Sequence, residues 1–293
     1  MNAGRGWLAR GAALTLLALV AAAVAAHFGA STARCPGGAV ALGPRCCGEG
    51  QSLVEGRCQG EPSRCPDALR VTAAGCVAPT QRVRIDAGAV GSFPPDWEAA
   101  GRDLPQGSVP AFEIDAFEVT EARWTECASA GPCAPRPDEG EPGTPVRDVS
   151  ATEAAAFCAF AGGRLPTPEE HAMAASGAEG RRYPWGFAGV VCRNASFGLV
   201  VGPCAEGASK PELAGMRPDG ATAGGVHDLA GNVAEWTLAG RTAFARGGSF
   251  RSTSSTALRA WSSEPTPPDT RRDDLGFRCA YPLTSTASKT PRL

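Results

Sequence analysis

The residues with the clearest chemical potential are the cysteines, of which the chain has twelve. They fall into two groups of six, at 35–76 and at 127–279. The first group repeats one spacing, with ten residues between two cysteines, in CPGGAVALGPRC, CGEGQSLVEGRC and CPDALRVTAAGC. Each segment has turn residues around a short apolar stretch, which predicts a β-hairpin closed by its own disulfide.

Other interpretations of this cysteine-rich repeat (35–78) stay open. Six cysteines allow many pairings, so pairing within each segment is a hypothesis. A metal site is disfavoured, because the repeat has no histidine and no two cysteines separated by two residues. We expect the repeat to be a small stapled spacer, with a ligand-binding module as the alternative.

The first 30 residues are typical of an export signal rather than of a folded segment. Arg5 and Arg10 precede an apolar run from Gly11 to Ala26, and small residues follow. This order predicts a signal peptide or a short signal anchor, since a membrane span takes roughly 20 residues. We expect an exported protein (periplasmic, cell-surface or extracellular) in a compartment where disulfides persist. Contact with a membrane is expected only through this segment, if it is retained.

The charge and the histidines narrow the function classes. The net charge is −2 and no segment is strongly basic, so nucleic acid is not an expected partner. Of three histidines, His27 lies in the export signal, which leaves His171 and His227. Two histidines with a carboxylate can hold iron, but a packed side chain is the simpler interpretation of each. Motifs of serine hydrolases, zinc peptidases, P-loop proteins and dinucleotide-binding proteins are absent from the sequence.

The second region, 82–282, has signals for a few helices and strands among many turns. The aromatic and β-branched segment Phe112–Val119 predicts a strand. Two capping boxes, Ser150–Glu153 and Thr167–Glu170, predict helices that end before glycines. The Ser/Thr-rich residues 283–293 are expected to form a disordered tail.

Several short motifs follow one another through the second region. In chain order they are Val119-Thr120 with Trp124, Phe157-Cys158, Ala161-Gly-Gly-Arg-Leu-Pro-Thr167, Tyr183-Pro-Trp-Gly186, Asp228-Leu-Ala-Gly-Asn-Val-Ala-Glu-Trp236, Arg246-Gly-Gly-Ser-Phe250 and Leu275-Gly-Phe-Arg-Cys279. This series resembles the formylglycine-generating enzyme family, also called the sulfatase-modifying factor family. The resemblance implies a mixed α/β (α+β) fold class. It also implies one compact domain with little regular secondary structure, related to C-type-lectin-like folds.

Members of this family oxidise a cysteine of a client sulfatase to formylglycine with molecular oxygen and copper. The resemblance implies that two cysteines after the Arg-Gly-Gly-Ser segment hold Cu(I), for which soft thiolates are preferred ligands. Those positions are Ser252 and Ala257 in this chain, so neither copper nor the oxidase activity is expected. If the cleft performs another oxidative chemistry, Ser249, Arg251, Ser252 and Arg259 would line it.

The resemblance also implies a calcium site in the segment that leads to Trp236. By position, Asp228 and Glu235 would supply side-chain oxygens, and Gly231 and Val233 would supply backbone carbonyls. Such a donor set suits a hard cation that takes about six to eight oxygens. A plain turn capped by the two carboxylates is the alternative.

We can also assign disulfide partners to the six cysteines of the second region. Cys158 and Cys279 match a disulfide of the family, and it would close a loop of about 120 residues, worth roughly 4–5 kcal/mol. The others would form two short local bridges, Cys127–Cys133 and Cys192–Cys204. No thiol is then left for redox chemistry.

Two functions stay open. We expect an exported, calcium-stabilised module without catalysis, which binds an unknown protein, peptide or small ligand. The alternative is an enzyme that uses the same cleft for another oxidative modification of a peptide or natural product. Formylglycine generation on a sulfatase is the function that the sequence favours least.

Overall fold

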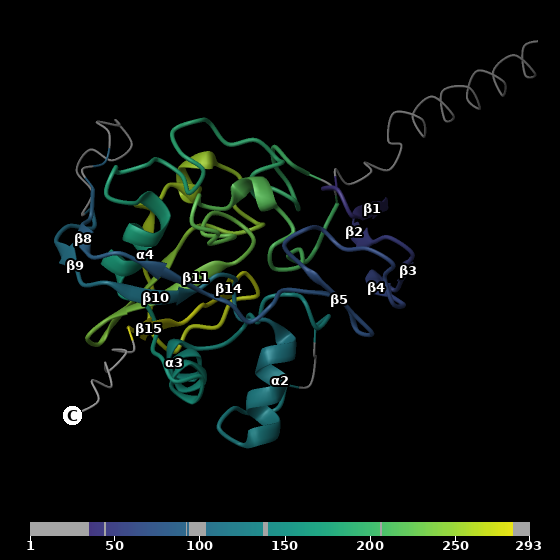
Figure 1. Cartoon of the computed structure of the whole chain (residues 1–293), viewed down its shortest axis with the longest axis horizontal. Coiled ribbons are helices and arrows are strands. Elements are labelled where there is room, and N and C mark those ends of the chain that lie inside the picture. Colours follow the sequence, from purple (N-terminus) through teal and green to yellow (C-terminus); the bar gives the residue numbers. More distant parts are fainter. Residues whose placement is uncertain are drawn as a thin grey trace, which may run out of the picture.

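The computed structural model describes residues 35–43, 45–91, 93, 104–136, 140–205 and 207–283. The predicted export signal and the predicted tail from Thr284 onward lie outside these residues. Within them, no helix has the length and apolar character that a membrane span requires. The described chain is a mixed α+β structure of short elements, as the sequence predicts (Figure 1).

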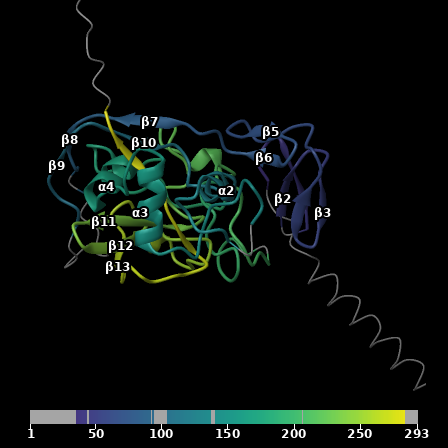
Figure 2. The same cartoon turned by 90° about the horizontal axis from the view of Figure 1, so that it is seen from below.

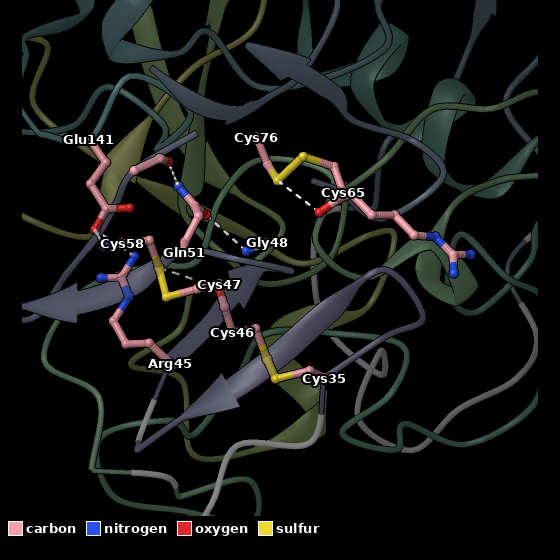
Figure 3. Close-up of a disulfide and its surroundings, with 12 residues drawn as sticks. Cys35, Arg45, Cys46, Cys47, Gly48, Gln51, Cys58, Cys65, Cys76 and Glu141 are labelled. Carbon is pink, nitrogen blue, oxygen red and sulfur yellow. Dashed lines mark hydrogen bonds and ion pairs between the residues drawn. A yellow bond between two sulfur atoms is a disulfide. The ribbon is translucent and has the colours of Figure 1, made fainter. Parts of the chain in front are cut away.

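The cysteine-rich repeat forms three antiparallel hairpins that lie together at one end of the molecule (Figures 1 and 2). Their strands are β1 (Ala39–Leu42), β2 (Arg45–Gly48), β3 (Ser52–Val54), β4 (Arg57–Gln59), β5 (Arg70–Thr72) and β6 (Gly75–Val77). Each hairpin is closed by a bridge between cysteines 11 positions apart, drawn in Figure 3: Cys35–Cys46, Cys47–Cys58 and Cys65–Cys76. The predicted pairing within each segment is confirmed. Because isolated two-stranded hairpins are marginally stable, these bridges are their main support.

The repeat shares a hydrophobic cluster with the main domain, and its role as a small stapled spacer stays a prediction. A side chain at Gly143 would come within 2.4 Å of the carbonyl oxygen of Cys76, so the main-domain loop approaches the third hairpin closely. The cluster joins Cys46, Cys65, Leu69, Cys76 and Ala78 of the repeat to Ala116, Phe117, Leu213, Ala214 and Met216 of the domain.

The main domain is built around two small sheets. Its strands are β7 (Arg82–Ile85), β8 (Gly88–Ala89), β9 (Ser108–Val109), β10 (Phe112–Asp115), β11 (Ala234–Ala239), β12 (Thr242–Arg246), β13 (Ser263–Pro265), β14 (Leu275–Gly276) and β15 (Ala280–Pro282). One sheet has the order β15–β10–β7 and the other β13–β12–β11–β14, while β8 and β9 pair separately. All these neighbours are antiparallel except β11 and β14, which run parallel.

The predicted strand Phe112–Val119 is wrong in its second half, since β10 ends at Asp115. Beyond that residue, the Ala116 N–H donates to the Gln81 carbonyl, whereas the Val119 N–H donates to the Phe277 carbonyl. These bonds go to different segments, so no regular ladder continues. The residues after β10 up to Val119 are nevertheless all buried.

Three helices flank the sheets: α2 (Glu121–Ala130), α3 (Ala151–Phe160) and α4 (Pro168–Ser176). The predicted capping boxes are confirmed at the start of α3, with Ser150 and Glu153, and of α4, with Thr167 and Glu170. Thr120 precedes α2 without a side-chain capping bond. Two short 3-10 turns, η1 (Pro218–Gly220) and η2 (Ser255–Leu258), complete the elements.

The largest hydrophobic cluster lies where α2 and α3 meet β11 and β14. The rings of Trp124 and Phe157 stack with centroids 5.8 Å apart, and Phe277 meets Phe157 edge-on at 5.4 Å. The Cys158–Cys279 bridge is buried in this cluster and ties α3 to the residue before β15. This core fixes the loops on which the candidate site residues lie.

Candidate functional site

The segment from Asp228 to Glu235 enters β11 through a sharp turn. Asp228, Gly231 and Asn232 have φ angles of 55°, 95° and 57°. A side chain at position 231 would come within 2.6 Å of the Ser196 carbonyl oxygen, so only glycine fits there. The turn carries the side chains of Asp228 and Glu235 into the interior, where both are buried.

Arg278 is the counter-ion of Glu235. Its Nε lies 2.7 Å from Glu235 Oε2, and its Nη2 lies 2.6 Å from Glu235 Oε1. Its other N–H groups donate to the backbone carbonyls of Asp115, Ala116 and His227. The two side chains are 0% and 1% exposed. Such a buried, fully hydrogen-bonded pair is held in place, because loss of either partner leaves an uncompensated charge.

Glu118 lies against the same turn. It accepts hydrogen bonds from Asn232 Nδ2 at 2.6 Å and from the Val233 N–H at 3.1 Å. Burial raises the pKa of Glu118 well above its ordinary value, and the nearby carboxylates of Asp228 and Glu235 add to the shift. The turn therefore faces an excess of acidic groups.

Asp228 has one oxygen within 2.6 Å of the Gly215 N–H, and burial raises its pKa to about 7. We predicted Asp228 as a site residue from the sequence but missed Glu118 and Arg278. The signal that was available is a charged residue between two apolar ones, in Phe117-Glu118-Val119 and Phe277-Arg278-Cys279. Charged groups in such positions are buried only when they are paired.

This donor set suits a calcium ion in charge, but its side chains do not form a coordination site by themselves. The carboxylates of Glu118, Asp228 and Glu235 outnumber the one guanidinium, Arg278, so a further positive charge would be accommodated. However, Glu235 would have to share its oxygens with Arg278. Among the described residues, His, Cys, Asp and Glu side chains do not form any metal-binding group of three or more. Backbone carbonyls of the turn would therefore have to complete the coordination.

Both histidines outside the export signal are packed side chains. His171 Nε2 lies 3.2 Å from Glu235 Oε2, and burial lowers the pKa of His171. The His227 ring stacks on Phe117 with centroids 4.6 Å apart, and burial, helped by Arg278, lowers its pKa to about 4. The iron-binding alternative lacks a triad of suitable geometry in the described part of the chain.

The predicted cleft begins where β12 leads into the Gly-Gly-Ser segment. Ser252 Oγ accepts a hydrogen bond from the Ser249 N–H at 2.9 Å, and Ser249 Oγ donates to Asp274 Oδ2 at 2.8 Å. A side chain at Gly248 would lie 3.1 Å from Ser252 Oγ and 2.9 Å from the Ala257 carbonyl oxygen. Ser252 and Ala257 are therefore neighbours around one glycine, at the positions where the family resemblance implies paired cysteines.

The two arginines of the predicted cleft engage different partners. Arg251 forms an exposed ion pair with Asp273. Arg259 Nη1 donates to the Tyr183 hydroxyl at 2.8 Å, and the Tyr183 ring stacks on Trp185 at 5.0 Å. Ser249 and Ser252 are thus joined by a hydrogen bond. The arginine side chains instead contact Asp273 in one case and the stacked Tyr183 and Trp185 in the other.

All the cysteines are consumed in disulfides, and none is free. The pairs in the main domain are those that we inferred from the sequence. They are Cys127–Cys133, Cys158–Cys279 and Cys192–Cys204. No thiolate remains to bind a soft metal ion or to act as a nucleophile.

Comparison with known proteins agrees with the motif series. The sulfatase-modifying factor enzyme 1-like domain matches residues 71–283, so the match begins within the third hairpin, and our boundary at 82 stays a prediction. Hercynine oxygenase from Mycolicibacterium thermoresistibile is 36% identical over 166 residues, which are 44% of this chain and 36% of that protein. Inactive C-alpha-formylglycine-generating enzyme 2 from Bos taurus is 36% identical over 152 residues, 46% of this chain and 50% of the relative. The matched segments are thus half or less of these relatives.

Solved structures show the same fold. PvdO from Pseudomonas aeruginosa superposes with a TM-score of 0.57 at 19% identity, covering 69% of this chain and 94% of PvdO. Treponema denticola variable protein 1 gives a TM-score of 0.54 at 21% identity, with the same two coverages. These likenesses establish the fold alone. The match over residues 71–283 shows that the chain belongs to the sulfatase-modifying factor enzyme 1-like domain family.

Proposed function

We propose that this chain is an exported, non-catalytic binding or interaction module on the fold of the sulfatase-modifying factor family. The observation that carries the proposal is the pair Ser252 and Ala257, which meet at Gly248 without a thiol. Because every cysteine is in a disulfide, no other thiolate can replace the missing copper ligands. The disulfides also favour export, since such bonds persist in oxidising compartments.

Two similar proteins support the proposal of a module without catalysis. Proteins named inactive C-alpha-formylglycine-generating enzyme 2, from Bos taurus and Mus musculus, are each 36% identical to this chain over 152 residues. Their names describe family members without the generating activity. A chain that has lost both copper-binding positions would be a comparable member, with its fold kept for recognition.

The proposal is tested with a sulfatase-type Cys-x-Pro-x-Arg peptide, Cu(I) and oxygen. We expect the purified mature protein to form no aldehyde, measured by mass spectrometry. The double variant Ser252→Cys/Ala257→Cys should gain about one tightly bound Cu(I), and each single variant should bind much more weakly, because a linear site needs two thiolates. Competition with a Cu(I)-chelating dye measures this. Aldehyde formation by the wild-type protein would refute the proposal.

Calcium is part of the proposal, as a structural ion at the turn before β11. Asp228 and Glu235, with the carbonyls of Gly231 and Val233, would hold it, and its charge would offset the buried carboxylates. An ion that binds only the folded state raises Tm. We expect millimolar calcium to raise the Tm of the wild-type protein and a chelator to lower it.

Two variants localise this calcium response. Asp228→Asn should lose most of it, because the variant removes a charged ligand. Asp67→Asn removes a carboxylate that is exposed in the repeat, and it should respond as the wild type does. Equal responses of all three proteins would show that no calcium binds at the turn.

The likeness to hercynine oxygenase favours a second candidate, an enzyme that uses the same cleft for another oxidative modification. Ser249, Ser252, Arg251 and Arg259 would then contact its substrate, a peptide or a natural product. Metal analysis of the purified protein separates the candidates. Stoichiometric iron or copper would support the enzyme, and calcium alone would support the module.

A further inference from the structure

Exposed apolar side chains gather on the loop that the Cys192–Cys204 bridge closes and on the turn before it. Phe187 is 54% exposed and Val191 53%, while Val201, at 71%, is the most exposed large apolar side chain of the described residues. The bridge joins cysteines 12 positions apart and restrains the loop on which Val201 lies. Single exposed apolar residues are normal, but several on one restrained segment indicate a contact surface. We call residues 187–204 the apolar loop.

The apolar loop lies beside the point where the described chain begins. Residues 191–193 line one cavity with residues 35–37 and 217–219. At this cavity, Arg193 Nε lies 2.8 Å from Asp219 Oδ2, and both side chains are largely exposed. Because this cation and this carboxylate are paired with each other, the loop offers a partner mainly apolar side chains.

The sequence before Cys35 limits the distance between this cavity and the apolar run of the predicted export signal (residues 11–26). Ala26, the last residue of the run, precedes Cys35 by 9 positions. A chain of that length spans at most about 30 Å. If the run stays in a membrane, the side of the domain that carries Cys35 and the apolar loop is therefore kept close to the membrane surface.

We propose that the apolar loop contacts the lipid surface of the membrane in which residues 11–26 are anchored. The proposal requires that this run is retained, and it is independent of whether the cleft is catalytic. Apolar side chains that leave water for the lipid interface gain free energy of transfer. Anchoring gives the loop a high effective concentration at that interface, so the weak affinity of a few side chains is sufficient.

The test uses the full chain in phosphatidylcholine vesicles, with and without bromine on the lipid acyl chains, because bromine quenches the fluorescence of nearby tryptophan. Trp7→Phe is the background, since Trp7 shortly precedes the apolar run and would be quenched in any orientation of the domain. In this background, Phe187→Trp should lose most of its added fluorescence in brominated vesicles. Phe160→Trp, at a 44% exposed position of α3, is the matched control and should lose little. Equal quenching at the two positions would overturn the proposal.

A second pair of variants shows which side chains make the contact. Val191→Asp/Val201→Asp places two charges on the apolar loop and should abolish the quenching at position 187, although the apolar run still holds the chain on the vesicles. Ala159→Asp/Phe160→Asp places two charges at exposed positions of α3 and should leave that quenching unchanged. An unchanged Tm shows that each variant is folded. Equal losses in the two double variants would contradict a specific contact of the apolar loop.

Two further measurements identify other occupants of the loop. Mass spectrometry of the chain extracted from membranes should find residues 11–26 present. A chain that begins after residue 26 would overturn the proposal but not the proposed function, which requires only export. Fluorescence of Phe187→Trp that changes with the protein-to-lipid ratio, and not with bromine, would assign the loop to a second copy of the chain and would also overturn the proposal.

Discussion

The cysteine-rich repeat and the main domain share one hydrophobic cluster, but they are stabilised in different ways. In the repeat, each bridge joins cysteines 11 positions apart and closes a hairpin of very short strands. In the main domain, one buried bridge spans 121 positions and lies among packed aromatic rings. The first arrangement fixes local shape, whereas the second ties distant parts of one core.

The burial of large apolar side chains explains why the two regions are stabilised in different ways. Val54 and Val71 of the hairpins are 43% and 46% exposed, whereas Trp236 and Phe277 of the domain are fully buried. Burial contributes about 25 cal/mol per Å² of apolar surface, so the repeat gains little from it. Covalent closure replaces a core in the repeat, and in the domain it adds to one.

The largest expected effect is the loss of the long bridge. Cys158→Ala/Cys279→Ala releases a loop of 121 positions, which the chain-entropy model values at about 5 kcal/mol. Both positions are buried in the main cluster, so the whole domain should lose stability. Urea unfolding of the purified variant, followed by tryptophan fluorescence, measures the change. An unchanged midpoint would mean that the core alone holds the domain.

The second effect tests the fully buried ion pair against a second two-bond pair whose arginine is half exposed. Arg278→Met leaves Glu235 without its counter-ion at 1% exposure, which should cost about 3–5 kcal/mol. Arg164 also contacts both oxygens of a glutamate, Glu170, but its side chain is 49% exposed. Arg164→Met should cost less than Arg278→Met, because water reaches the Arg164 guanidinium and the buried Glu170 keeps its hydrogen bond from the Thr167 N–H. Equal losses in urea unfolding would show that burial does not decide the strength of these pairs.

The third effect is local. Cys47→Ala/Cys58→Ala opens a hairpin whose cysteines are 11 positions apart, a bridge worth about 3 kcal/mol in the same model. Because that hairpin has little core of its own, we expect it to unfold while the domain keeps its midpoint. Hydrogen exchange should then rise at Leu53 and its neighbours and stay low in β11. Loss of protection in β11 would mean that the two regions unfold as one unit.

The features that could be predicted from the sequence are those with short-range causes. The cysteine spacing gave the hairpin bridges, and the two capping boxes gave the starts of α3 and α4, because each depends on residues a few positions apart. The fold class followed from the order of many motifs. The hairpin and capping signals each lie in one short stretch of the chain, whereas the fold class needed the whole motif series.

The partners of charged side chains could not be predicted. Arg278 lies between β14 and β15 and pairs with Glu235 on β11, and Arg251 pairs with Asp273 rather than lying in a shared cleft with Arg259. Four basic residues from separate segments line one cavity: Arg45, Arg57, Arg147 and Lys210. Such contacts depend on how distant segments pack, which residue types and local spacing do not determine. The end of β10 at Asp115 has the same cause, since its next bonds go to two separate segments.

The smallest effect is a pH dependence that belongs to the main domain alone. Burial lowers the pKa of His227 from 6.5 to about 4, so the folded state resists protonation of this ring. Its contribution to stability is therefore present above about pH 6.5 and is lost as the pH falls toward 4. His227→Gln should lose less unfolding free energy than the wild type over this range.

Asp228, whose raised pKa acts in the opposite direction, is common to both proteins and cancels in the difference between them. The repeat contains no histidine, so the hairpin variant Cys47→Ala/Cys58→Ala should keep the wild-type pH slope in urea unfolding of the domain. Parallel curves for His227→Gln and the wild type would show that this ring does not sense acid. A changed slope in the hairpin variant would show that the repeat influences the charged interior, because it contributes no titrating ring itself.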